Sequence, residues 1–252
     1  MNRDVSAGRR WALAVLSVTA LLIVGCSHRS ISNSGYQDRY GRADNPFYKG
    51  ELSELHVLGI DPSKTVSEKD IAAALDTKKK VSLRKGDSVL LIQSGAPIPD
   101  SEMTQAMENY FTVGIYSGVP EGLAVDSGQA ADAENRARVL RLAAAKGGYG
   151  TIVCYWGLLE ASQKGLATKG VSWVPVVGWS LPDETQRMRI RLKTAVVDVR
   201  TGAWATFSPA AFEDTKTSGI TSREGTDQAQ VASLKSKAYA ALAEEIVKRF
   251  GQ

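Results

Sequence analysis

The chain has 252 residues, with 31 basic against 27 acidic side chains and a formal net charge of +4 at pH 7. This small excess of positive charge gives no general argument for nucleic-acid binding. Only two histidines and two cysteines are present, so catalytic triads and metal sites have few candidate residues. A length of this order fits one large domain with short additional segments.

An export signal is predicted at the amino-terminal end. The first ten residues carry three arginines and one aspartate, and the apolar run WALAVLSVTALLIV follows from Trp11 to Val24. A charged start before a short apolar run is typical of such a signal. The run is well short of the roughly 20 residues that a membrane-spanning helix needs. We therefore predict that residues 1–25 are a signal peptide that is removed.

The end of this segment indicates a lipid anchor. Ile23, Val24 and Gly25 run directly into Cys26, and IVGC resembles the bacterial lipobox. The resemblance implies that Cys26 carries a covalent lipid, palmitate included, and it implies no other cofactor. An ordinary secretory signal that happens to end near a cysteine is the alternative. Ser27 replaces the aspartate that retains enteric lipoproteins in the inner membrane, so the resemblance implies the periplasmic face of the outer membrane.

Three segments follow the predicted signal. The signal holds three basic residues and one acidic residue, so 28 basic and 26 acidic ones remain, a formal charge of +2. Residues 26–50 are polar, without apolar periodicity, and are predicted to be a lipidated flexible tether. Residues 51–85 are predicted to be an amino-terminal extension with a short helix in SEKDIAAALD, which Ser67 can cap. Residues 86–252 are predicted to form a periplasmic α+β domain.

Regular elements are predicted throughout this last segment. In chain order they are a strand at 88–95, a helix at 100–111 with Asp100 as its cap, a strand at 112–118, a helix at 126–148, a strand at 149–159, a hairpin at 187–208 that turns at 200–202, and a helix at 228–250. The order is strand, helix, strand, helix, three strands, helix. It predicts an α+β fold with a mixed sheet covered by helices.

This order, together with the hairpin sequence DVRTGAW at 198–204, resembles a domain shared by three groups of envelope proteins. They are the curli secretion lipoprotein, the amino-terminal domain of the Tol-system translocation protein B, and the lipoprotein activators of penicillin-binding proteins. The resemblance covers residues 86–252. It implies a protein-binding or assembly module with an envelope protein as its partner, and it leaves oligomerisation open.

No catalytic or metal-binding motif is present in the sequence. GxSxG, HExxH, paired CxxC and GxxxxGK[ST] are all absent, so no catalytic or metal-binding residue is assigned. Cys154 lies in the apolar stretch TIVCYWG and is predicted to be a small buried hydrophobic residue. A non-catalytic module is therefore favoured, and no nucleic acid is expected. The alternative is a peptidase-like envelope hydrolase with carboxylates that the sequence does not identify.

A run of alternating cations is the first candidate binding feature. Side chains at Arg187, Arg189, Arg191 and Lys193 alternate with Met188, Ile190 and Leu192, so on a strand the four cations share one face. The same parity continues as Ala195, Val197 and Val199, which requires a bulge or a second covering layer. One hypothesis is an anionic partner, either lipid head groups or an acidic protein surface. The alternative is a solvated face balanced by acidic neighbours.

The second candidate is the stretch VSWVPVVGWS at residues 171–180, in the long connection before the cationic strand. Pro175 cannot donate to a sheet ladder, which argues against a central strand. Packing onto the domain's own sheet is one interpretation. The hypothesis that we follow is docking, in which Trp173 and Trp179 contact a partner or the membrane surface, because tryptophan is enriched in binding hot spots.

Overall fold

The computed structural model describes residues 26–34, 48–77, 80–120, 133–165, 184–218 and 223–251. Its strands are β1 (Cys26–Ser30), β2 (Ser88–Gln93), β3 (Thr112–Tyr116), β4 (Thr151–Gly165), β5 (Glu184–Asp198), β6 (Trp204–Phe207) and β7 (Phe212–Ser218). Its helices are η1 (Ile31–Asn33), α2 (Glu54–Leu58), α3 (Glu68–Asp76), α4 (Ser101–Glu108), α5 (Ala133–Lys146) and α6 (Arg223–Phe250).

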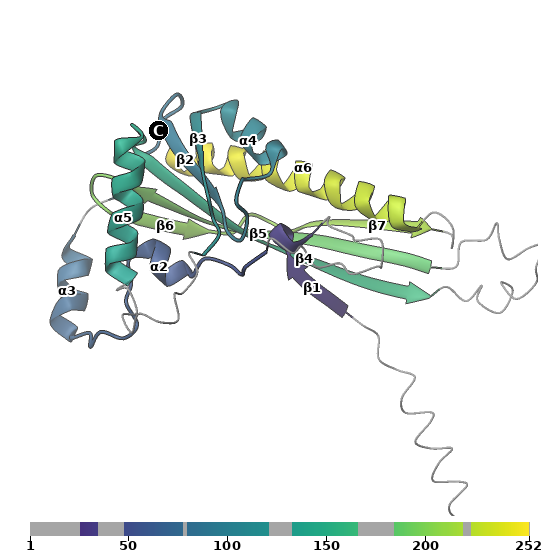
Figure 1. Cartoon of the computed structure of the whole chain (residues 1–252), viewed down its shortest axis with the longest axis horizontal. Coiled ribbons are helices and arrows are strands. Elements are labelled where there is room, and N and C mark those ends of the chain that lie inside the picture. The colour runs from purple at the N-terminus through teal and green to yellow at the C-terminus, as the bar shows by residue number, and fades with distance from the viewer. Residues whose placement is uncertain are drawn as a thin grey trace, which may run out of the picture.

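The strands form one mixed sheet with two ends that differ. β4 and β5 are long antiparallel partners that run the whole length of the sheet (Figure 1). At one end they belong to the order β3-β2-β4-β5-β6, in which β2 pairs in parallel with both β3 and β4. At the other end β1 pairs with β4 and β7 pairs with β5. We call this second part, β1-β4-β5-β7, the projecting half.

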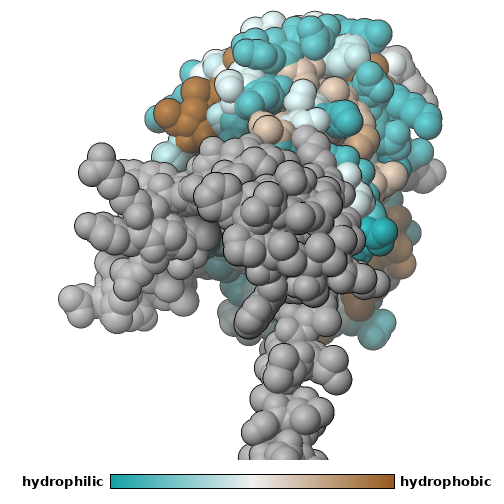
Figure 2. Space-filling view, turned by 90° about the vertical axis from the view of Figure 1, so that its right-hand side faces the viewer, coloured by the Kyte–Doolittle hydropathy of each residue, from teal (hydrophilic) through white to brown (hydrophobic). Residues whose placement is uncertain are grey.

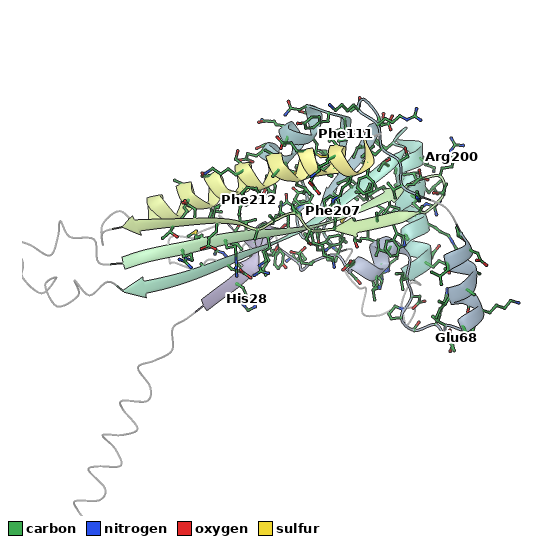
Figure 3. The ribbon with its side chains drawn as sticks, turned by 180° about the vertical axis from the view of Figure 1, so that it is seen from behind. His28, Glu68, Phe111, Arg200, Phe207 and Phe212 are labelled. Atoms are coloured by element: carbon green, nitrogen blue, oxygen red, sulfur yellow. The ribbon has the colours of Figure 1, made fainter. Side chains whose placement is uncertain are left out.

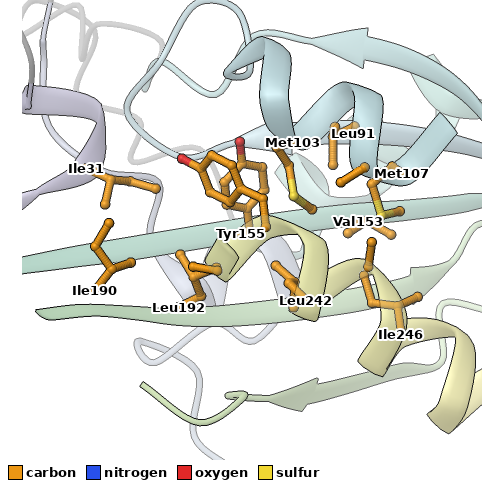
Figure 4. Close-up of a cluster of buried hydrophobic side chains, with 14 of the residues drawn as sticks. Ile31, Leu91, Met103, Met107, Val153, Tyr155, Ile190, Leu192, Leu242 and Ile246 are labelled. Atoms are coloured by element: carbon orange, nitrogen blue, oxygen red, sulfur yellow. The ribbon is translucent and has the colours of Figure 1, made fainter. Parts of the chain in front are cut away.

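Helices cover the two faces of the sheet unequally. α4 and α6 lie on one face, and the long α6 continues along the projecting half (Figure 1). Leu234, Leu242 and Ile246 of α6 are at most 2% exposed and join the larger core cluster with residues of β2, β4 and β5 (Figure 4). α2 and α5 lie on the opposite face, where a second cluster includes Ile152, Cys154 and Val197. Among the described residues, the projecting half therefore has one face covered by α6 and one face that no helix covers, which we call the open face.

The predicted α+β fold is confirmed. Each predicted strand and helix from residue 86 onward has a counterpart, and the hairpin turns at Arg200–Gly202, where Gly202 has a φ of 73°. One strand was not predicted. The sequence predicted three strands between α5 and α6, and the structure has a fourth, β7, which follows β6. Its sequence, FEDTKTS, has no apolar alternation beyond Phe212, so only its pairing with β5 identifies it as a strand.

The predicted flexible tether at 26–50 is wrong for its first residues. Cys26–Ser30 form β1, and η1 follows immediately. Ile31 is 1% exposed and packs in the larger core cluster (Figure 4). Gly157 of β4 makes this possible, because a Cβ there would lie 2.3 Å from Cδ1 of Ile31. The sequence pattern missed this docking because one isoleucine among polar residues gives no periodicity.

The amino-terminal extension predicted at 51–85 packs onto the domain at several described positions. Val57 of α2 is 6% exposed and joins the cluster under α5, and Leu83 is fully buried in the larger cluster. The helix predicted at SEKDIAAALD is present as α3, and Ser67 caps it in a capping box with Asp70. None of the residues of α3 is buried, and Leu75 is 80% exposed.

Candidate functional site

The alternation predicted for β5 is present and sorts its side chains onto two faces. Met188, Ile190 and Leu192 are at most 3% exposed and face the core under α6. The four cations, Arg187, Arg189, Arg191 and Lys193, lie on the open face of the projecting half. The strand pattern alone was sufficient for this prediction.

The change of environment beyond Lys193 comes from a second covering layer. Ala195, Val197 and Val199 have the same parity as the cations but are at most 9% exposed, because they pack in the cluster formed with α2 and α5. No bulge is involved, since the β4–β5 register runs without a break from Thr151↔Asp198 to Gly165↔Glu184. The open face therefore ends where α2 begins to cover the sheet.

Each of the four cations has an acidic partner. Arg187 Nε lies 3.0 Å from Glu213, and Arg191 Nε lies 3.3 Å from Glu160. Arg189 shares Glu160 with Arg191, and Lys193 pairs with Glu54. This arrangement largely matches the alternative of acidic neighbours, since three carboxylates offset three of the four positive charges. Exposed ion pairs of this kind contribute only about 0–1 kcal/mol each, so the cations can exchange partners at little cost.

A groove opens beside the cationic row. It has a volume of about 650 Å³, and its walls combine apolar and charged side chains from five segments of the chain, among them Arg29, Tyr48, Trp156, Arg191 and Pro209. Trp156 is held in place by a 2.9 Å hydrogen bond that its Nε1 donates to the Leu52 carbonyl. The groove joins an apolar floor to a cationic rim.

The two tryptophans of the second candidate lie outside the described residues. Trp173 and Trp179, with the rest of the stretch 171–180, fall between Gly165 and Glu184. These two flanking residues are register partners at the end of the projecting half. The docking hypothesis for the stretch stays a prediction.

Sequence reasoning missed a buried polar network on the covered face. Gln93, at the end of β2, is 1% exposed; its Oε1 accepts from the Tyr155 hydroxyl at 2.6 Å and from the Asp100 amide at 2.7 Å. The Asp100 carboxylate in turn accepts from Tyr239 and, at 2.8 Å, from Lys235. Asp100 occupies the N-cap position of α4, as predicted, but its side chain does not cap the helix. The one available signal was a glutamine ending an otherwise apolar strand.

The network also fills the crevice at which sheets of this kind bind ligands. β2 lies between two parallel neighbours whose connecting helices cover opposite faces, and ligands of open α/β sheets bind beyond the carboxyl end of such a strand. Here Ser32 of η1 accepts from Gln93 and donates to the Ser94 carbonyl, and the Leu52 amide donates to the Ser94 hydroxyl. The chain's own amino-terminal residues therefore occupy this position.

The two tyrosines of the network should titrate only when the protein unfolds. Burial, together with the charge of Asp100, raises the pKa of Tyr155 and Tyr239 well above the ordinary value of 10.0. Because the folded pKa exceeds the unfolded one, their contribution to stability is complete below about pH 10 and is lost as the pH rises through the folded pKa. In an alkaline absorbance titration, Tyr155→Phe should remove amplitude only from the phase that accompanies unfolding. Early loss in Tyr155→Phe would contradict the prediction.

Cys154 is a core residue, as predicted. Its side chain is fully buried in the cluster under α5, and burial raises the pKa of its thiol well above the usual range. Within the described ranges, no group of three or more His, Cys, Asp or Glu side chains could hold a metal ion. In the same part of the chain, no helix combines the length and apolar character needed to cross a bilayer.

The described residues form a mixed α+β domain with a groove beside a row of ion-paired cations on one face of its sheet. The family of YafT bacterial lipoproteins matches residues 53–249, and the chain belongs to this family. No curated protein matches the chain. Among solved structures, the PelC dodecamer from Paraburkholderia phytofirmans is similar at 15% sequence identity, with a TM-score of 0.27, over 65% of this chain and 92% of that chain.

Proposed function

We propose that the protein is a lipid-anchored module that binds an envelope protein through the open face of its projecting half. A lipid on Cys26 would hold it at the periplasmic face of the outer membrane. Membership of a bacterial lipoprotein family supports the anchor. The binding role rests on one observation: in the described part of the chain α2 and α5 do not reach the far part of their sheet face, where Arg187, Arg191 and Lys193 are exposed beside the groove.

The chemistry of this face indicates the kind of partner. Trp156 and Leu158 offer apolar contact area in the groove, and tryptophan and arginine are the residue types most enriched in binding hot spots. Four cations share three carboxylates, which leaves a local excess of positive charge. A protein segment with an apolar anchor flanked by acidic side chains would match both features. None of the observed contacts favours the peptidase-like alternative.

Site-specific photocrosslinking in intact cells tests the proposal. A photoreactive residue at Leu158 or Arg191 should form an adduct with the same envelope protein, identified by mass spectrometry. The matched control places it at Val139 or Leu142, which are 56% and 55% exposed on the outer surface of α5. Adducts formed only from the α5 positions would show that the open face is not the binding surface.

The contribution of the cations can be measured on the same adduct. Changing Arg187 and Arg191 to glutamine should reduce the adduct formed from Leu158 several-fold and weaken its dependence on salt, because the electrostatic attraction is lost. Arg138→Gln, which removes an exposed ion-paired arginine of α5, is the matched control and should have no effect. The melting temperature should change little in all of these variants. An unchanged adduct with an unchanged salt dependence would mean that the cations are only solvated.

A further inference from the structure

Strand β1 begins at the candidate lipidation site and would restrict how the domain moves relative to the membrane. β1 begins at Cys26 itself, and its backbone pairs with β4 from Cys26↔Ser162 to Ser30↔Leu158. If Cys26 carries the lipid, as the proposed function states, no flexible residue separates the lipid from the sheet. A lipid attached through a strand of the sheet restrains the whole domain, whereas a lipid on a free tether would restrain only its distance from the membrane.

The residues that directly follow β1 are held by contacts with several elements of the domain. Ile31 fills the space left by Gly157, and Ser32 is held between Gln93 and the Ser94 carbonyl. Lys235 of α6 also donates a 3.3 Å hydrogen bond to the Ile31 carbonyl. The segment 30–32 is thus fixed by contacts to β2, β4 and α6, and β1 continues from it in a defined direction.

The position of Cys26 in the sheet determines which end of the domain lies near the lipid. Cys26, Ser162, Arg187 and Thr215 are register partners in one row across the projecting half. At about 4.8 Å between strands, Thr215 lies about 14 Å from Cys26 along this row. Asp198, at the other end of β5, is eleven residues from Arg187, which is about 37 Å at roughly 3.4 Å per residue.

We propose that β1 acts as a rigid link, so that the protein stands upright with the Gly165 end of β4 and the Glu184 end of β5 nearest the bilayer surface. The turn at Arg200 then points away from the membrane; in Figure 3 Arg200 lies at the opposite end from the free ends of β4, β5 and β7, and His28 lies between the two ends. Figure 2 views the molecule from this end, and the coloured residues visible around it are mostly hydrophilic with a few hydrophobic ones. The open face stands sideways and stays accessible to a protein partner.

Fluorescence quenching in proteoliposomes tests this orientation. Single cysteines are introduced at Thr215, Ser208 and Thr201, which are all exposed, and labelled with a fluorophore. Cys154 is buried and Cys26 is blocked by its lipid, so background labelling is low. Lipids with a quencher on the head group should strongly reduce the fluorescence at Thr215, reduce it weakly at Ser208, and leave it unchanged at Thr201. Equal quenching at all three sites would overturn the proposal, and strong quenching at both Thr215 and Ser208 would show a domain lying on its open face.

Two variants test whether β1 is the link. Gly157→Ala should displace Ile31 and release the amino-terminal segment, so the difference between Thr215 and Thr201 should disappear. Because this variant could also unfold the domain, a second one inserts about 12 Gly/Ser residues after Ser27, a spacer with an end-to-end distance of roughly 20 Å. The same spacer placed after Ser63, in the exposed loop between α2 and α3, is the control and should preserve the difference. A difference that persists with the spacer after Ser27 would overturn the role of β1.

The experiment separates this proposal from the lipid assignment on which it depends. Incorporation of labelled palmitate is measured on the same samples. If Cys26 carries no lipid, the protein does not associate with the vesicles and no position is quenched, which contradicts the proposed anchor. If the label is present and the quenching does not depend on position, the anchor is correct and only the fixed orientation is wrong.

Discussion

Cells that express Cys26→Ala in place of the natural protein are expected to incorporate no labelled palmitate into it. The thiol of Cys26 is the acceptor that the sequence IVGC indicates, and alanine offers no nucleophile. Loss of the acyl chains removes about 0.8 kcal/mol of membrane affinity per buried methylene, so stable attachment is lost altogether. The protein should therefore disappear from the outer-membrane fraction. Labelling with radioactive palmitate, followed by separation of the two membranes, measures both effects.

The control for this experiment is the second cysteine. Cys154→Ala should keep the label and the outer-membrane location, because Cys154 is fully buried on the α5 side of the sheet and cannot be acylated in the folded protein. Alanine at position 26 leaves the backbone pairing of β1 with β4 intact, so the fold should not change. Palmitate still found on Cys26→Ala would refute the assignment of the anchor.

The largest effect on stability is expected for Gln93→Ala. The change removes the acceptor for the Tyr155 hydroxyl and the Asp100 amide, and the donor to Ser32, from a site that is 1% exposed. Buried polar groups left without partners cost about 1–3 kcal/mol each, and a cavity adds to this cost. We expect the free energy of unfolding to fall by about 3–5 kcal/mol. Urea denaturation should show a lower midpoint with an unchanged slope.

Two comparisons make this prediction specific. Gln105→Ala, on the exposed side of α4, removes the same side chain from the surface and should cost less than about 0.5 kcal/mol. In a Tyr155→Phe background, Gln93→Ala should cost less than in the natural protein, because the hydroxyl that it would leave unpaired is already gone. If Gln93→Ala costs no more than Gln105→Ala, the network contributes nothing measurable.

Residues with a strong local signal were placed correctly from the sequence. The parity of β5 separated Arg189 and Arg191 from Met188 and Ile190, because a strand alternates its side chains whatever it packs against. The four-residue spacing of Leu234, Ala238, Leu242 and Ile246 likewise predicted the buried side of α6. Strands β2 and β4 were recognised because short apolar runs bounded by glycine are typical of strands with two covered faces.

Features that depend on distant partners were not predictable in this way. β1 and β7 are polar in sequence and become strands only because β4 and β5 offer long, unpaired edges at the projecting half. Gln93, Asp100 and Tyr155 meet because three separate elements converge, and no spacing in the chain records such a convergence. The carboxylates that pair with the cations come from Glu54, Glu160 and Glu213, which are far apart along the chain.

The sequence by itself determined the class of the fold, the alternating cationic strand and the candidate lipid acceptor at Cys26, because each of these depends on side chains within a few residues of one another. The tertiary structure decided that the predicted tether begins as a strand, that the cations pair with carboxylates, and that none of the described helices covers half of one sheet face. These depend on which segments lie side by side, and the free energy of that choice is spread over contacts between residues distant in the chain.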